Sequence, residues 1–210
     1  MSEAADDPLV VLVDDDSAVR EALGDLLNSV GTETMAFSSA AEFLEAQLPD
    51  RPGCLVLDVR MQGLSGLDLQ NHLTELGLGR PIVFLTGHGD IAMSVQAMKA
   101  GAVDFLTKPV RDQTFLDAVS RAIEADITRR TIASETQRYV ELYQTLTPRE
   151  RQVFRYVVKG SLNKQIAFEL KISEVTVKLH RSSMMKKLNA SSTAHLFGIW
   201  QSLPAEMRAN

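Results

Sequence analysis

Acidic, hydroxyl and basic residues follow a series of short apolar runs in the first half of the chain. Three successive aspartates, Asp14 to Asp16, come after the first run, and Asp58 follows a later one. Thr86 and Lys108 close the two apolar runs after that. Clustered carboxylates repel one another unless a cation joins them, and all-oxygen ligands suit Mg²⁺. With a lysine nearby, such a metal site neutralises an incoming phosphoryl group and leaves one carboxylate as the nucleophile.

The elements around these residues decide whether they meet. Five short runs are rich in β-branched or aromatic residues, which favours strands, and the segments between them space apolar residues as helices do. This alternation predicts an α/β fold with a doubly wound parallel sheet. Because functional groups gather at the carboxyl ends of strands in such sheets, the polar residues should share one rim. The predicted strands are residues 9–13, 33–37, 54–57, 82–86 and 103–107.

A long helix is expected after the last strand. No glycine or proline occurs between Pro109 and Pro148, so the fifth helix can continue as a helical linker. Its apolar spacing is too irregular to establish a coiled coil, and a dimerising role stays open. We therefore divide the chain into an α/β domain (1–125), a helical linker (126–145) and an all-α domain (146–210).

The last part of the chain shows helical periodicity only. Thr147, Pro148 and Glu150 supply an N-cap, a first-turn proline and the glutamate of a capping box. Later breaks predict four helices with short turns. The second and third helices, at about 163–170 and 173–188, fit a helix-turn-helix. Its predicted shared core consists of Ile166, Ala167, Leu170, Ile172, Val175, Val177 and Leu188.

The net charge of -5 conceals a division along the chain. Residues 1–126 carry 21 acidic and 8 basic residues, a net charge of -13, whereas residues 127–210 carry 6 acidic and 14 basic residues, a net charge of +8. The basic second part favours a polyanion such as nucleic acid as its partner. Two differently charged solvated surfaces would give the same numbers, so charge alone does not decide.

Composition excludes several classes of protein. A hydrophobic content of 45% is ordinary for a globular protein. The single cysteine, Cys54, lies in an apolar run, which excludes an internal disulfide and a cysteine-rich metal site, and we interpret it as a core residue. No apolar run approaches the roughly 20 residues of a membrane-spanning helix. The first seven residues are acidic where an export signal would be basic, so we expect a cytoplasmic protein with no membrane partner.

The polar residues at the four strand ends together resemble the receiver domains of two-component response regulators. The resemblance covers residues 8 to about 125, and it lies in the combination of motifs and not in any one of them. It implies that Asp58 is the phosphoacceptor. It also implies a Mg²⁺ site made of Asp14, Asp15 and Asp58, with the backbone carbonyl of Arg60 completing the metal shell.

The same resemblance assigns roles to residues around the phosphoacceptor. Thr86 would hydrogen-bond the phosphoryl oxygens, and Lys108 would pair with them. Phe105 would be the aromatic switch residue that moves with Thr86. The Lys108-Pro109 peptide bond is expected to be cis.

One residue departs from the receiver pattern, and one other protein class shares part of it. Gln62 occupies the place where the family usually has proline, so the lifetime of the phosphoryl group stays undefined. The haloacid-dehalogenase-like phosphatases form a rival class, because they also place a nucleophilic aspartate after a strand and their motif is loosely echoed by residues 14–18. Ala18 fails the last position of that motif, and no second acidic pair or cap domain is visible. Asp16 is expected to be a helix cap only.

The helical part resembles the LuxR-type helix-turn-helix over residues 146 to about 205. Contacts to base edges give sequence choice, whereas basic groups on phosphates give affinity. The resemblance implies that Lys178, Leu179 and Ser182 face base edges. A domain that binds protein instead of DNA is the alternative. The residues expected nearer the phosphates are Lys164, Thr176, His180, Arg181 and Lys186.

The two resemblances combine in the FixJ/NarL-type response regulators, and the stretch SVQAMKAGAVDFLTKP is similar to the FixJ branch. A transcription factor is implied, not an enzyme, apart from accepting its own phosphoryl group and slowly losing it. A sensor histidine kinase would phosphorylate Asp58, and the fourth-helix face, Ile91 to Lys99, would repack to form a homodimer or to release the all-α domain. Two recognition helices would then bind promoter DNA, and an activator would also contact RNA polymerase.

Overall fold

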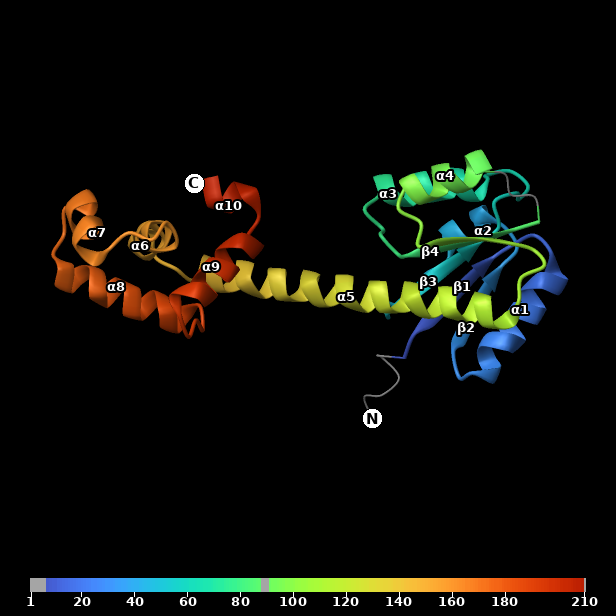
Figure 1. Ribbon diagram of the computed structural model, residues 1–210, viewed down its shortest axis with the longest axis horizontal. Coiled ribbons are helices and arrows are strands. Elements are labelled where there is room, and N and C mark those ends of the chain that lie inside the picture. The colour runs from blue at the N-terminus through green and yellow to red at the C-terminus, as the bar shows by residue number, and fades with distance from the viewer. Residues whose placement is uncertain (1–6, 88–90, 210) are drawn as a thin grey trace. The chain divides into compact units, whose positions relative to one another are not determined.

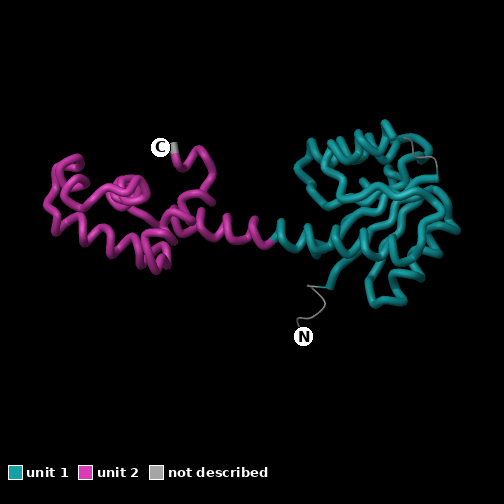
Figure 2. Tube along the Cα trace, viewed as in Figure 1, with its two compact units in different colours: residues 1–130 teal, residues 131–210 magenta. Residues whose placement is uncertain are grey.

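The computed structural model describes residues 7–87 and 91–209 and divides into two compact units, unit 1 (residues 1–130) and unit 2 (residues 131–210), which Figure 2 colours separately. Most of the acidic segment that we weighed against an export signal, residues 1–6, lies outside the described residues. Within the described ranges, no helix is both long enough and apolar enough to cross a membrane.

Unit 1 is a five-stranded parallel sheet between two layers of helices (Figure 1), which confirms the predicted fold class. The strands lie in the order β2-β1-β3-β4-β5. The third strand begins one residue earlier than predicted, and the fifth begins one residue later. The elements are β1 (Leu9–Val13), α1 (Ser17–Ser29), β2 (Glu33–Phe37), α2 (Ala40–Glu45), β3 (Gly53–Leu57), α3 (Gly66–Glu75), β4 (Ile82–Thr86), α4 (Ile91–Lys99), β5 (Asp104–Thr107) and α5 (Asp112–Gln144).

Both faces of the central strands are buried, and alternate residues serve different cores. In β1, Leu9, Val11 and Val13 pack in a cluster with side chains from α2, α3 and α4. Val10 and Leu12 pack on the other face with side chains from α1 and α5. Strands covered on both sides need apolar residues at every position, which explains why these runs do not alternate with polar residues.

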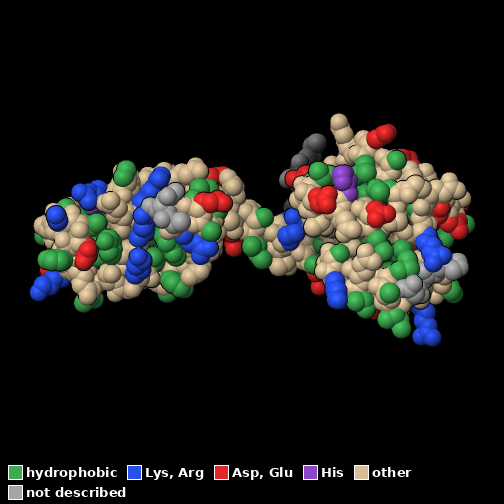
Figure 3. All heavy atoms as spheres, turned by 90° about the horizontal axis from the view of Figure 1, so that it is seen from above, with side chains coloured by type: hydrophobic (Ala, Val, Ile, Leu, Met, Phe, Trp, Pro, Cys, Tyr) green, Lys and Arg blue, Asp and Glu red, His purple; other side chains and the backbone are tan. Residues whose placement is uncertain are grey.

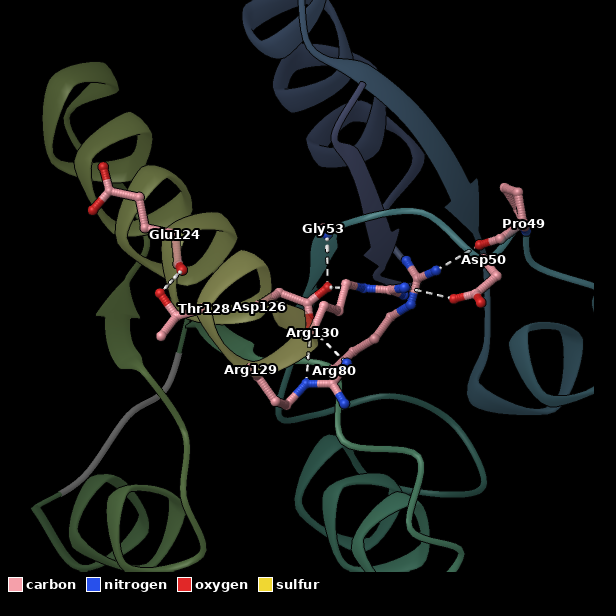
Figure 4. Close-up of polar contacts among 9 residues, drawn as sticks. All are labelled: Pro49, Asp50, Gly53, Arg80, Glu124, Asp126, Thr128, Arg129 and Arg130. Atoms are coloured by element: carbon pink, nitrogen blue, oxygen red, sulfur yellow. Dashed lines mark hydrogen bonds and ion pairs between the residues drawn. The ribbon is translucent and has the colours of Figure 1, made fainter. Parts of the chain in front are cut away.

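A buried carboxylate fastens α5 to the sheet (Figure 4). Asp126 has no exposed surface, and it accepts a hydrogen bond from the backbone N–H of Gly53 at 3.0 Å. The Arg129 Nη2 and Nε atoms donate to Asp126 Oδ1 at 2.7 and 3.0 Å. The Arg130 Nε atom donates to Asp126 Oδ2 at 2.9 Å. A Cβ atom on Gly53 would lie 1.9 Å from the carbonyl oxygen of Leu9, so only glycine fits at this first residue of β3.

Within its described residues, unit 2 contains the end of α5, the four predicted helices and one further short helix. The last turns of α5 contribute to its core, because Tyr143 and the following Leu146 are buried there beside Phe154. The predicted linker therefore ends inside the helical unit. The further elements are α6 (Pro148–Val158), α7 (Asn163–Leu170), α8 (Glu174–Lys187), α9 (Thr193–Ser202) and α10 (Ala205–Ala209).

The predicted helix starts are confirmed, whereas one predicted core residue is wrong. Thr147 caps α6 with a complete capping box, and Ser173 caps α8. The turn between α7 and α8 passes through Lys171, which has a left-handed φ of 54°. Val175 is 67% exposed, because it stands two positions before the buried Val177 and residues two apart point to nearly opposite sides of a helix.

Glu150 joins the start of α6 to α8. Its carboxylate accepts hydrogen bonds from the Lys187 ammonium at 2.7 Å, the Ser183 hydroxyl at 2.6 Å and the Thr147 backbone N–H at 2.7 Å. Burial would raise the pKa of this carboxyl, but these hydrogen bonds outweigh it and lower the pKa to about 2. The ionised form is therefore the one that the fold stabilises.

The stability of unit 2 should depend on pH through Glu150. Because its pKa falls from 4.5 to about 2 on folding, its contribution is complete above pH 4.5 and is lost as the pH falls toward 2. Glu150→Gln should lower the free energy of unfolding by about 2 kcal/mol at neutral pH and flatten this pH dependence. Urea unfolding followed by fluorescence of Trp200, the only tryptophan, measures both effects. Glu169→Gln, at an exposed site of α7, is the control. An unchanged pH dependence of stability in Glu150→Gln would show that Glu150 does not cause it.

The Asp126 anchor should be essential to unit 1. Asp126→Ala leaves two arginines and the Gly53 N–H without their buried acceptor, so we expect a loss of about 3 kcal/mol in the free energy of unfolding. Calorimetry of the full chain gives this value, and the Gly53 amide should exchange its hydrogen faster. Glu124→Ala changes an exposed residue of the same helix and should have little effect. Equal stability of the two variants would show that the anchor is dispensable.

Candidate functional site

Four adjacent strands bring the predicted polar residues to one rim of the sheet. Asp14 follows β1, Asp58 follows β3, Thr86 ends β4 and Lys108 follows β5. These strands are parallel and are neighbours in the order β1-β3-β4-β5. The side chains that the sequence analysis expected to meet therefore start from the same edge, at the carboxyl ends of the strands.

A lysine bridges two of the buried carboxylates. The Lys108 Nζ donates to Asp14 Oδ2 at 2.5 Å and to Asp58 Oδ2 at 2.9 Å. Burial raises the pKa of the Asp14 carboxyl, although the lysine works against it. Burial would lower the pKa of Lys108, but its hydrogen bonds to the two carboxylates hold it above the ordinary value. The ammonium therefore stays charged and partly neutralises the acidic rim.

Three carboxylates are arranged so that one cation can join them. Asp14, Asp15 and Asp58 each offer an oxygen atom, and these oxygens lie within 4.8 Å of one another. Asp15 is exposed, so the group is open to water on one side. A hard oxygen donor set with access to water fits Mg²⁺, which usually retains several water ligands. Asp16 instead caps α1, accepting from the Ala18 N–H at 2.9 Å, as predicted.

The loop after β3 is held tightly around Asp58. The Arg60 N–H donates to Asp58 Oδ1 at 3.1 Å, so both carboxylate oxygens of Asp58 are engaged. Gln62 is exposed in this loop. Gly66 was not among the predicted site residues, yet a Cβ atom there would lie 2.2 Å from the carbonyl oxygen of Asp58. Gly66 lets α3 approach the backbone beside Asp58, and its N–H donates to Val59 O at 3.0 Å.

Thr86 and Phe105 lie on the two strands at the other side of the pocket. Thr86 is 1% exposed, and its carbonyl oxygen accepts from the Lys108 N–H at 2.8 Å. Phe105 is partly buried and packs on Phe84, with ring centroids 6.0 Å apart. The Lys108-Pro109 bond is cis, as expected.

One face of α8 presents the predicted base-reading residues to solvent. Lys178, Leu179 and Ser182 are all exposed, and Lys186 lies one turn further along the same face. The exposed Val175 extends this face toward the start of the helix; the sequence analysis had placed it in the core. An exposed helix face with basic, hydroxyl and apolar side chains has the chemistry that major-groove contacts use.

The residues predicted to lie near phosphates differ from one another in exposure and in hydrogen bonding. Lys164 is exposed at the start of α7. The Thr176 hydroxyl pairs with Ser173 at 2.8 Å, and Arg181 donates to Asn163 Oδ1 at 2.8 Å. His180 is partly buried. On the face drawn in Figure 3, lysine and arginine side chains gather over unit 2, in agreement with the charge division found in the sequence.

Comparison with known families matches the two halves separately. The model of the response regulator receiver domain matches residues 10–120. The model described as bacterial regulatory proteins, luxR family, matches residues 144–199. The receiver match spans the acidic rim, which favours this interpretation of Asp14 to Asp16 over the phosphatase alternative.

Relatives and solved structures cover nearly the whole chain. Nodulation protein W of Bradyrhizobium diazoefficiens is 49% identical over 202 residues, which are 96% of this chain and 89% of that protein. The transcriptional regulatory protein FixJ of Rhizobium meliloti is 42% identical over 90% of this chain and 93% of its own. The structure of the response regulator StyR has a TM-score of 0.81 and 48% identity, covering 93% of this chain and 98% of that one. The chain therefore belongs to the FixJ-like two-component response regulators and is a phospho-activated transcription factor with a receiver domain and a LuxR-type helix-turn-helix.

Proposed function

We propose that Asp58 accepts a phosphoryl group from a sensor histidine kinase and that this modification controls dimerisation and promoter binding. The observation that carries the assignment is the position of Asp58 at the end of the central strand β3, whose neighbours are β1 and β4. Asp14 and Asp15 follow β1, and Thr86 ends β4. A phosphoryl group on Asp58 would have carboxylates for a metal on one side and a hydroxyl on the other.

The groups around Asp58 fit the transfer step. An Asp58 oxygen attacks the phosphorus atom, and the bond from phosphorus to the histidine nitrogen of the kinase breaks. Mg²⁺ held by Asp14, Asp15, Asp58 and the Arg60 backbone carbonyl would supply positive charge there. Lys108 already contacts the reacting carboxylate at 2.9 Å, so its ammonium can pass to a phosphoryl oxygen. Later hydrolysis of the acyl phosphate resets the protein, which turns over no external substrate.

The proposed output begins at Thr86 and Phe105 and reaches α4. Movement of Thr86 toward a phosphoryl oxygen would free space for the Phe105 ring, which packs on Phe84 beneath it. On α4, Ile91 is 84% exposed and Val95 is 46% exposed, an apolar surface that a second receiver would cover. We propose that phosphorylation adapts this face to form the homodimer.

The DNA-binding step follows from the exposed face of α8. Two such helices in a dimer would enter successive major grooves, with Lys178, Leu179 and Ser182 at base edges. Lys164, Thr176, His180, Arg181 and Lys186 would lie nearer the phosphates. We assign the receiver to residues 1–125, the linker to 126–145 and the DNA-binding domain to 146–210. The protein would act where its promoters lie, in the cytoplasm, and an activator would also touch RNA polymerase.

Phosphorylation should require Asp58 itself. Asp58→Asn keeps the size of the side chain but removes the nucleophilic carboxylate, so labelled acetyl phosphate should no longer mark the protein. Asp16→Asn, which alters only the cap of α1, should be labelled like the parent chain, and removal of Mg²⁺ should abolish labelling of both. Label that persists in Asp58→Asn would show that another residue accepts the phosphoryl group.

Lys178 and Lys186 should affect DNA binding in different ways. Lys178→Ala should weaken binding to a duplex selected from random DNA by about 2 kcal/mol and relax the preference at one base position. Lys186→Ala should weaken binding to all duplexes alike and reduce its salt dependence. Fluorescence anisotropy at several salt concentrations separates the two effects. Unchanged specificity in Lys178→Ala would mean that another side chain reads the bases.

A further inference from the structure

A cavity of about 390 Å³ opens at the edge of unit 1 opposite the phosphoryl site. Several of its lining residues lie in the segments just before β3 and β4, such as Pro49 and Gly79, whereas Asp58 and Thr86 stand where these strands end. A volume of this order suits a small organic molecule. Its walls are largely apolar and include Phe43, Leu44, Leu48, Leu55, Leu73 and Leu78.

Three arginines line one side of this cavity, and two of them already have carboxylate partners (Figure 4). Arg129 and Arg130 bind the buried Asp126. Arg130 also binds Asp50 at 2.7 Å. The arginine side of the cavity is thus ordered by ion pairs, and its side chains are positioned before any ligand arrives.

Arg80 is the arginine of the three that makes no ion pair within the described residues. Its Nη2 donates to the carbonyl oxygen of Pro49 at 2.7 Å, which is a neutral acceptor. Its Nη1 is buried and has no hydrogen-bond partner within the part of the chain that the structure describes. Burial lowers the pKa of Arg80, and the neighbouring Arg130 lowers it further, although the charges of Asp126 and Asp50 act in the opposite direction. Three guanidinium groups thus stand beside two carboxylates, both of which pair with Arg129 or Arg130, and a negative charge beside Arg80 would balance the third guanidinium.

We propose that this cavity binds a small monocarboxylate with a compact apolar body. The carboxylate would pair with the part of the Arg80 guanidinium that lines the cavity, and the apolar body would lie against the leucine walls. A planar guanidinium matches a carboxylate in geometry and charge. Inorganic phosphate or a dicarboxylate would place polar oxygens against the apolar walls, so a single carboxylate is the better fit.

The cavity and the phosphoryl pocket have no residue in common. None of the cavity's lining residues contributes to the acidic rim around Asp58, so occupancy does not require phosphorylation. The cavity does share Arg129 and Arg130 with the anchor that fastens α5 to β3. A ligand would thus lie beside Arg129 and Arg130, near the start of the predicted linker.

Calorimetric titration of the full, unphosphorylated chain with benzoate tests the proposal. We expect a dissociation constant of about 1 mM and at least roughly tenfold weaker binding of benzamide, which has the same shape without the charge. Arg80→Met should remove benzoate binding. Arg111→Met, at an exposed arginine outside the cavity, should leave it unchanged.

A second variant, at Gly79, adds a side chain to the lining of the cavity and leaves the arginines unchanged. Gly79 lines the cavity, its φ is not left-handed, and a Cβ atom there meets no atom within 4 Å. Gly79→Leu should therefore fold with an unchanged unfolding temperature and lose benzoate binding. No benzoate binding by the parent chain up to about 10 mM would overturn the proposal. Equal binding of benzoate and benzamide, or parent-like benzoate binding by folded Arg80→Met or Gly79→Leu, would overturn it as well.

Discussion

A parallel sheet covered by helices on both faces can carry polar groups only where its strands end. In β1, β3 and β4 almost every side chain is buried, so the interior of the sheet has no place for a charged group. The carboxyl ends are different, because Asp14, Asp58 and Lys108 lie there and satisfy one another through two short ion pairs. The chemistry of the receiver is confined to this rim by the same burial that stabilises the fold.

The long helix α5 contributes side chains to a core in each unit. In unit 1 it packs through apolar side chains such as Phe115 and Val119, and the buried Asp126 adds a polar contact to the N–H of Gly53. In unit 2 the contact is through Tyr143, with the following Leu146, in the helical core. Residues of one continuous helix therefore belong to both cores, and α5 is the covalent connection between the two units.

Local patterns predicted most of the fold and the acidic rim. These patterns are local, because each lies in the same short segment as the element that it predicts. Examples are the strands rich in β-branched residues, the Thr147 capping box and the Ser173 cap. What could not be predicted depends on contacts between distant segments. Asp126 is an ordinary helical aspartate until Gly53, 73 positions earlier in the chain, is brought to it. Gly66 is likewise required only because α3 packs on the backbone of Asp58.

The two ends of the sheet in unit 1 have opposite imbalances of charge. At the carboxyl ends, Asp14, Asp15 and Asp58 surround the single ammonium of Lys108, so the group has an excess of negative charge that a divalent cation can neutralise. At the other end, Arg129 and Arg130 pair with Asp126 and Asp50, Arg80 makes no ion pair within the described residues, and the excess is positive. Buried or half-buried charge is costly unless it is paired, and the cost is the same in kind for both signs. The need for a paired charge therefore favours a cation beside Asp58 at one end of the sheet and an anion beside Arg80 at the other.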